Sequence, residues 1–523
     1  MKAPGQAEGD IAPQVRSGRL LRPMAIVTIL TLASQGIGVL TQVIIASKFG
    51  AGRSMDAYLA GVTLPQYIVT VLTSSLVVVF IPVFVEYAAS HREAEAWRVA
   101  SSVLNVSILA LSAIAICGIV FAKPLLRLTV PGLSADALNL AARVARVSWP
   151  MIVPTGILSL LTGVYQAGHR FTWPATTVII GAVLNLIVLV TLAPVLGVVG
   201  IAVASTMSAT IQAVALIRIA VAPGRYRFTF DWRHAGTREV FQLLLPLLIS
   251  GLFIRWTPVV DRYIASHLAA GSIAQLGYAF RLLGLSALLI STGLTTVVFP
   301  RLAFNAAVAD MTAMRGTISL GLRLMWLVVA PATVLGAVLA QPLVSLAFQR
   351  GQFTTGDAVI VAHFLRVYLL ALAAMCLGNI TGRILYALKR TRLVAGVGLI
   401  EALAYAAYTT VLANHFGAVG VALGYVAYFN VSILWQIVWI RTHTGGYGGR
   451  RVLRSYARTS LAAVAAGGAT QLVMLATPHI LMQLTIGALA GTTIYIALLF
   501  LLRSDEAYVF RSILDLRHSL RWG

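Results

Sequence analysis

The chain has 523 residues, of which 59% are hydrophobic and only 11% are charged. Soluble globular domains carry roughly a quarter charged residues, so this composition excludes an ordinary soluble protein. The formal net charge of +23 does not indicate a nucleic-acid partner, because the basic residues separate long apolar segments instead of forming one patch.

The first apolar segment follows a polar N-terminus. Residues 1–23 are polar and basic, and residues 24–49 form an apolar stretch without a small-residue cleavage pattern. That stretch is longer than the apolar core of a cleaved signal peptide, so it predicts a first transmembrane helix. The two cysteines, Cys117 and Cys376, both lie in apolar runs, which leaves no disulfide framework and no paired cysteine site for a metal.

A membrane-spanning helix needs about 20 mainly apolar residues, and this criterion predicts about 14 spans. The expected ranges are 24–47, 57–84, 99–122, 141–166, 174–195, 198–220, 240–266, 273–299, 317–340, 358–387, 393–413, 418–440, 457–476 and 480–502. The predicted fold class is therefore an all-α, polytopic membrane protein.

The loops between these spans predict the orientation. With both termini in the cytoplasm, about 26 basic residues fall on the cytoplasmic side and about five outside. Lys and Arg accumulate in cytoplasmic loops, so this bias predicts cytoplasmic N- and C-termini.

The chain also contains an internal duplication. Residues Ile45–Gly52 recur as Ile264–Gly271, and four further matches follow in the same order. These pair residues 79–82 with 297–300, 123–125 with 341–343, 165–167 with 386–388, and 197–202 with 417–422. The repeat holds an even number of helices, so both copies enter the membrane from the same side and form two parallel lobes.

The duplication predicts the domain organisation. Two parallel six-helix lobes would enclose a central cavity, and rocking of the lobes would give alternating access. The expected parts are an N-terminal tail (1–23), an N-lobe (24–222), a linker (223–239), a C-lobe (240–441), a loop (442–456), a final helix pair (457–502) and a C-terminal tail (503–523).

Several charged residues fall inside predicted spans, where each costs about 2.5–3.5 kcal/mol unless it has a partner, water or a function. They include Arg255, Asp261 and Arg262 in the seventh span, Arg281 in the eighth and Glu401 in the eleventh. Pro258 removes a backbone donor and is expected to kink the seventh span beside Arg255. Pro65 is a second hinge candidate.

These charges have two interpretations. In the first, Arg255, Arg262 and Arg281 line the cavity and bind an anionic group such as a diphosphate, for which guanidinium offers forked donors. In the second, Asp261 forms a structural pair with an arginine and the other arginines extend to the membrane interface. Glu401 is either a coupling site for a cation or proton, or a partner of one of the arginines.

No known catalytic motif is present in the sequence. It contains no Walker loop, no HExxH pair and no GxSxG elbow. We therefore expect a transporter without a cofactor or metal rather than an enzyme.

The chain resembles the MurJ/MviN branch of the multidrug/oligosaccharidyl-lipid/polysaccharide exporter superfamily, whose MurJ members flip lipid II. The most specific match is Phe348–Thr354, which is similar to the family's F-x-x-G-x-F-T signature. The other matching segments are Phe49–Gly52, Asp56–Tyr58, Leu64–Pro65, Phe80–Phe84, Asp261–Ser266, Tyr278–Leu282 and Phe299–Pro300. The resemblance implies a bacterial inner-membrane protein.

The chain departs from the family in its first two spans, and the family's basic and acidic positions in the second span fall on Val69, Thr70 and Ser74. Where the family reads S-R-x-x-G-x-x-R-D, Gln35, Thr41 and Gln42 replace two arginines and an aspartate. Of the headgroup residues that the resemblance implies, Arg281 and Asp56 remain and Arg255 is in a plausible position. The predicted headgroup site comprises Arg255, Arg262 and Arg281 together with Gln35, Thr41 and Gln42. We predict coupling or gating roles for Asp56, Asp261 and Glu401.

The leading hypothesis is a flippase for a polyprenyl-diphosphate-linked glycan, either lipid II or a related envelope or exopolysaccharide unit. Expected partners are that glycan, membrane lipids and envelope-synthesis proteins. One alternative is a cation-coupled multidrug exporter of the same superfamily, which would need an acidic cavity. Another is a scaffold for envelope assembly that transports nothing.

Overall fold

The computed structural model describes residues 17–90, 92–220, 225–307, 311–388 and 390–504. All regular secondary structure within these ranges is helical. The predicted all-α, polytopic fold class is confirmed. Most of both predicted tails, residues 1–16 and 505–523, lies outside the described residues.

Thirteen helices in the described ranges are long and apolar enough to cross a membrane. About 14 were expected, and the difference lies in α16 (Thr391–Thr444), which is assigned as one helix of 54 residues. A straight helix of that length would measure about 80 Å, far more than the roughly 30 Å of hydrocarbon in a bilayer. The backbone is non-helical at Gly417, where the chain turns back, so α16 holds two crossings.

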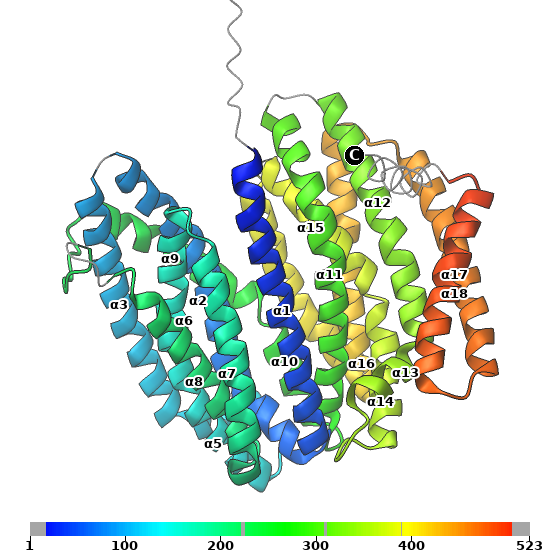
Figure 1. Cartoon of the computed structure of the whole chain (residues 1–523), viewed down its shortest axis with the longest axis horizontal. Helices are drawn as coiled ribbons and strands as arrows, with labels where there is room; N and C mark the ends of the chain where they lie inside the picture. The colour runs from blue at the N-terminus through cyan, green and yellow to red at the C-terminus, as the bar shows by residue number, and fades with distance from the viewer. Residues whose placement is uncertain (1–16, 91, 221–224, 308–310, 389, 505–523) are drawn as a thin grey trace, which may run out of the picture.

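The helices form two groups and a peripheral pair (Figure 1). The N-terminal half contains α1 (Ser17–Phe49), α2 (Arg53–Ala89), α3 (Glu93–Val120), α4 (Ala122–Thr129), α5 (Ala135–Ser148), α6 (Ile152–Ala167), α7 (Thr172–Leu196) and α8 (Val199–Ile217). The C-terminal half contains α9 (Ala235–Ile254), α10 (Thr257–Ser266), α11 (Ser272–Ala307), α12 (Met311–Val338), α13 (Ala340–Phe348), α14 (Thr355–Leu369), α15 (Leu372–Ala387) and α16. The pair is α17 (Gly449–Ala476) and α18 (Ile480–Leu501), which pack on α12 and α13.

The two groups meet at one end of the molecule and diverge toward the other. In Figure 1 their ribbons converge near the loop between α1 and α2, and they separate toward the first turns of α1. By the orientation expected from the basic loops, the closed end is the outer one and the divergent end is cytoplasmic.

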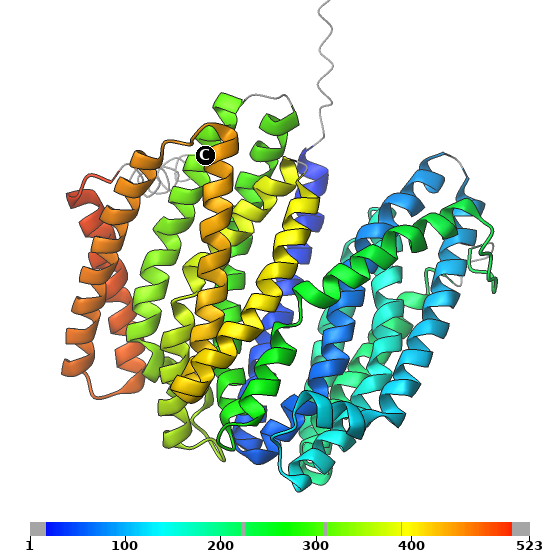
Figure 2. The same ribbon diagram turned by 180° about the vertical axis from the view of Figure 1, so that it is seen from behind.

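The first helix of each half lies between the groups. α1 contacts α7 of the N-terminal half and α13 of the C-terminal half (Figure 1). α9 runs obliquely across the N-terminal group, against α2 and α3 (Figure 2), and also contacts α16, while α10 contacts α2 and continues onto α11 and α16. Part of the predicted C-lobe, residues 240–441, therefore packs on the N-lobe.

The duplicated segments have the same local geometry. Gly197 has φ 60 and ψ −142, and Gly417 has φ 57 and ψ −136. Three residues later, Gly200 packs closely against Ala193 of the preceding helix, and Gly420 packs in the same way against the equivalent Ala413. A Cβ on either glycine would crowd these neighbours. These close helix pairs need glycine, because small residues allow backbones to approach in a membrane.

We predict that Gly420→Ala destabilises the protein, because its methyl group would overlap the backbone of Leu412 and Ala413. Overpacking of this kind costs about 1–3 kcal/mol. Thermal unfolding in detergent should show a lowered melting temperature. The matched control is Gly468→Ala, whose methyl group meets no neighbour within 4 Å, and equal melting temperatures for the two variants would contradict the prediction.

Candidate functional site

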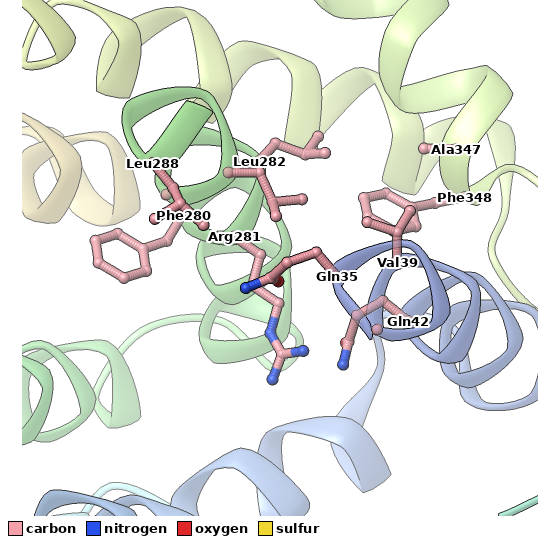
Figure 3. A pocket seen from close by; sticks show the side chains of 12 residues that line it. Gln35, Val39, Gln42, Phe280, Arg281, Leu282, Leu288, Ala347 and Phe348 are labelled. Atoms are coloured by element: carbon pink, nitrogen blue, oxygen red, sulfur yellow. The ribbon is translucent and has the colours of Figure 1, made fainter. Parts of the chain in front are cut away.

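A cavity of about 400 Å³ lies between α1 and α11 (Figure 3). Gln35, Gln42 and Arg281 direct their polar ends into this space, while the ring of Phe280 turns away from them. The rest of the lining is apolar and comes from α1, α11 and α13. It comprises Gly38, Val39, Leu282, Gly284, Leu285, Leu288, Ala347 and Phe348.

A second cavity of about 270 Å³ adjoins the first, since Phe280 and Arg281 line both. It also contains Arg255 and Arg262, so all three predicted arginines line one space. Its opposite wall is α2. The site thus combines arginines from the C-terminal half with helices from the N-terminal half.

The break between α9 and α10 places Arg255 in this cavity. α9 ends at Ile254, Arg255 has non-helical φ −108 and ψ 14, and α10 begins at Thr257 with Pro258 in its first turn. The predicted kink beside Arg255 is confirmed, and it is a full interruption. A proline lacks the N–H that would continue the hydrogen bonds of the preceding helix, so the chain changes direction here and exposes the Arg255 side chain.

Arg262 has a mixed environment. It lines the second cavity, yet one of its guanidinium nitrogens donates to the carbonyl of Ile273 at 3.0 Å. Its neighbour Asp261 turns into the C-terminal half, where it accepts a hydrogen bond from Tyr405. The structural interpretation expected Asp261 to pair with an arginine. In this structure its side-chain hydrogen-bond partner is Tyr405 instead.

The three polar residues of α1 do not share one environment. Gln35 and Gln42 line the larger cavity. Thr41 is 6% exposed, and its hydroxyl donates to the carbonyl of Ile37 one turn earlier. Neither cavity is lined by Thr41.

Asp56 lies at the closed junction between the halves, which is the outer junction in the orientation expected from the basic loops. Its carboxylate is buried and accepts hydrogen bonds from the backbone N–H groups of Gly271 and Ala274, the latter at 2.7 Å. These groups belong to the start of α11, so Asp56 caps a helix of the opposite half. Its negative charge lies at the positive end of that helix's dipole, which is a stabilising arrangement.

Two equivalent backbone contacts close the same junction. The N–H of Gly132 donates to the hydroxyl of Ser266 at 3.2 Å, and the N–H of Gln352 donates to the carbonyl of Ser47 at 2.8 Å. Gly132 and Gly351 occupy equivalent positions of the repeat, as do Ser47 and Ser266. A Cβ on either glycine would overlap the opposing serine carbonyl. Each half therefore inserts one glycine loop against the end of the other half's first span.

Glu401 lies away from the cavities, inside the C-terminal half. It accepts hydrogen bonds from the indole N–H of Trp435 at 2.6 Å and from the hydroxyl of Ser432 at 3.2 Å. Ser432 accepts in turn from Gln436, which also accepts from Thr381. The carboxylate thus belongs to a chain of hydrogen-bonded side chains rather than to an ion pair with a cavity arginine.

The sequence interpretation placed Thr70 among the family's cavity positions but missed Thr63, Gln66 and Tyr67 of the α2 wall. Thr63, Gln66, Tyr67 and Thr70 all line the second cavity, and the hydroxyl of Tyr67 donates to the carbonyl of Leu252 on α9. Their spacing of three and four residues puts them on one helix face. A polar stripe on an otherwise apolar span was the available signal.

The family model "Lipid II flippase MurJ" matches residues 45–489. A probable lipid II flippase MurJ from Buchnera aphidicola is 24% identical over 415 residues, covering 77% of this chain and 80% of that protein. A solved lipid II flippase MurJ in an inward closed conformation superposes with a TM-score of 0.79 at 20% identity, covering 94% of this chain and all of that one. An inward-facing multidrug resistance transporter of the MATE family gives a TM-score of 0.69 at 16% identity over 82% of this chain and 97% of its own.

We predict that Asp56→Ala loosens the outer junction, because two backbone donors of α11 lose their acceptor. An unsatisfied buried group costs about 1–3 kcal/mol. Cysteine introduced at the buried position Ala265, in a Cys117→Ala background, should react faster with a membrane-impermeant maleimide in the Asp56→Ala variant. Asp136→Ala, at an exposed position of α5, is the control and should leave the rate unchanged. Equal rates for both variants would show that Asp56 does not hold the junction.

Proposed function

The chain belongs to the lipid II flippase MurJ family, and from this premise we propose that it flips a polyprenyl-diphosphate-linked glycan across the bacterial inner membrane by alternating access. The cargo is lipid II or a related envelope or exopolysaccharide unit, supplied by envelope-synthesis proteins. The N- and C-termini lie in the cytoplasm in this proposal, as the basic loops favour.

The observation that carries the proposal is the meeting of Arg255, Arg262 and Arg281 around one cavity between the halves. Guanidinium groups match the oxygens of a diphosphate with forked, charge-assisted hydrogen bonds. Placing three cations inside a membrane protein is costly without a counter-charge. An anionic substrate headgroup supplies that charge.

The larger cavity suits the remainder of such a molecule. Gln35 and Gln42 offer neutral amide donors and acceptors for sugar hydroxyls or the diphosphate. The leucines of α11 and Val39 of α1 give the rest of the wall an apolar character that fits the first isoprene units. Thr41 has no direct role in this proposal, because it is buried against its own helix.

Alternating access would require the outer junction to open. Asp56 and the two glycine loops hold that end closed, while the helix groups diverge at the other end (Figure 1). We assign gating to Asp56 and hinge roles to Pro258, which follows the break in the seventh span, and Pro65, which lies within α2.

The cavity chemistry disfavours the multidrug exporter. Cationic drugs are bound by carboxylates and aromatic faces, but no Asp or Glu is among the described residues that line the two central cavities. Their charge is basic, which suits an anionic headgroup.

We also propose that Asp261 and Glu401 couple a cation or proton to the movement. Both are carboxylates enclosed in the C-terminal half, held by Tyr405 and by Trp435 with Ser432 respectively. A carboxylate at this depth changes the local charge balance when it binds a cation. Because Asp261 adjoins Arg262, a change there reaches the cavity directly.

We predict that the double substitution Arg255→Ala/Arg281→Ala strongly reduces flipping of polyprenyl-diphosphate sugars in proteoliposomes. Each hydrogen bond to a charged group contributes about 1.5–3 kcal/mol, so one lost arginine lowers headgroup affinity by roughly 10–100-fold. The control is Arg366→Ala, whose side chain is exposed and bonds the backbone carbonyl of Ala337. Unchanged flipping in the double variant would reject the site.

We predict that Glu401→Gln and Asp261→Asn abolish the acceleration of flipping by an imposed sodium or proton gradient. Both changes keep a hydrogen-bond acceptor in place while removing the negative charge. The measurement compares flipping with and without the gradient in proteoliposomes. Glu239→Gln, at an exposed position of α9, serves as the control. Gradient dependence that survives both substitutions would refute the coupling role.

A further inference from the structure

The segment before α9 alternates aromatic and basic side chains. Tyr226, Phe228, Phe230 and Trp232 carry the aromatic rings, and Arg225, Arg227 and Arg233 carry the charges. The segment has no helix or strand assignment and lies along α3, at the edge of the N-terminal group farthest from the C-terminal group (Figure 2). We call residues 225–233 the aromatic–arginine strap.

Three buried polar residues of α3 hold the strap. Ser101 accepts from the N–H of Arg227 at 3.1 Å, and Ser102 accepts from the N–H of Asp231 at 3.2 Å. Asn105 donates to the carbonyl of Thr229 at 2.9 Å and accepts from the hydroxyl of Tyr226 at 2.7 Å. Unsatisfied backbone groups are costly near a bilayer, so α3 supplies the partners that this segment needs there.

The aromatic side chains of the strap remain largely uncovered. Phe228 is 78% exposed and Trp232 is 54% exposed. Phe228 packs edge-on against Phe230, with ring centroids 5.3 Å apart, and Trp232 contacts Phe241 of α9 at 5.1 Å. Two ring pairs, Phe228 with Phe230 and Trp232 with Phe241, thus contribute exposed apolar surface at the strap.

The charges of the strap are predominantly basic. Its one acidic residue, Asp231, pairs with Arg98 of α3 at 2.7 Å. The guanidinium of Arg225 lies over the ring of Trp97 at 5.6 Å. Arg227 and Arg233 are exposed. The surface therefore combines uncovered aromatic rings with a net positive charge.

The position of the strap identifies what covers it. It is at the divergent, basic end of the molecule, and the same helix α3 presents Leu109 and Ile116, 64% and 61% exposed, farther along its length. Those side chains face the hydrocarbon of the bilayer, so the strap lies where that hydrocarbon gives way to headgroups. Aromatic rings are enriched at this level, and arginines there attract anionic lipids.

We propose that the aromatic–arginine strap is a binding site for anionic phospholipid headgroups, with Phe228 inserted among the acyl chains and the charges of Arg225, Arg227 and Arg233 attracting the phosphates. This site is separate from the central cavities and does not depend on the transported molecule. It also fixes the start of α9, which begins at Ala235 directly after the strap. Since Arg255 directly follows the last residue of α9, a lipid bound at the strap holds the opposite end of the helix that positions a cavity residue.

The test uses the full chain in lipid nanodiscs, with an environment-sensitive dye on Phe228→Cys in a Cys117→Ala background. Cys376 is buried, so the dye is not expected to react with it. Brominated phosphatidylglycerol and brominated phosphatidylcholine are compared as quenchers. We expect stronger quenching by the anionic lipid, and a fall in that preference of about fivefold for each of Arg225, Arg227 and Arg233 that is changed to Gln.

The matched control changes three arginines of another basic loop, Arg450→Gln/Arg451→Gln/Arg454→Gln, and should leave the preference at the dye intact. Size-exclusion elution of each variant checks that it folds. Absence of quenching by either lipid would place the strap outside the bilayer, as a protein-covered surface would be, and would overturn the proposal. Equal quenching by both lipids, or an equal effect of the two triple substitutions, would overturn it as well.

Discussion

The interruption of the seventh span between α9 and α10 is the feature on which the central site depends. A continuous helix would keep all its backbone hydrogen bonds, but Arg255 would then lie on the side of a straight helix instead of at a break in the chain. The break lets α9 pack on α2, α3 and α16, while α10 packs on α16, α2 and α11. The same segment therefore joins the two halves and delivers a guanidinium between them, at a point where Pro258 leaves the helix unable to continue.

The two halves share a fold but not a charge distribution. Equivalent glycines, Gly197 and Gly417, turn the chain with almost the same backbone angles. The N-terminal half nevertheless contributes amides to the cavities, through Gln35 and Gln42, whereas the C-terminal half contributes arginines. Duplication conserved the packing, which depends on small residues and backbone approach. The polar lining diverged, because it touches the cavity rather than the helix contacts.

Much of the architecture was predictable from the sequence, because the physics of a bilayer leaves few choices. Length and hydropathy predicted the spans, and Pro258 predicted the interruption beside Arg255. The site was harder. Spacing cannot show that Thr41 turns inward while Gln35 and Gln42 face the cavity. Nor can it show that Asp261 bonds Tyr405, which lies 144 residues away in the chain. Such pairings depend on how helices rotate against their neighbours, and a single sequence does not record that rotation.

The outer junction has a consequence for divergence among distant relatives. Its two glycine-loop contacts use backbone N–H donors, with a serine hydroxyl or carbonyl as acceptor. Substitution at Gln352 changes its side chain but leaves the N–H that reaches Ser47 in place. Closure therefore tolerates substitution at many positions, provided that Gly132 and Gly351 stay without a Cβ and Ser266 keeps its hydroxyl. If the residues that close the junction were sought only among charged side chains, Asp56 would be found. The contacts donated by backbone N–H groups would be overlooked.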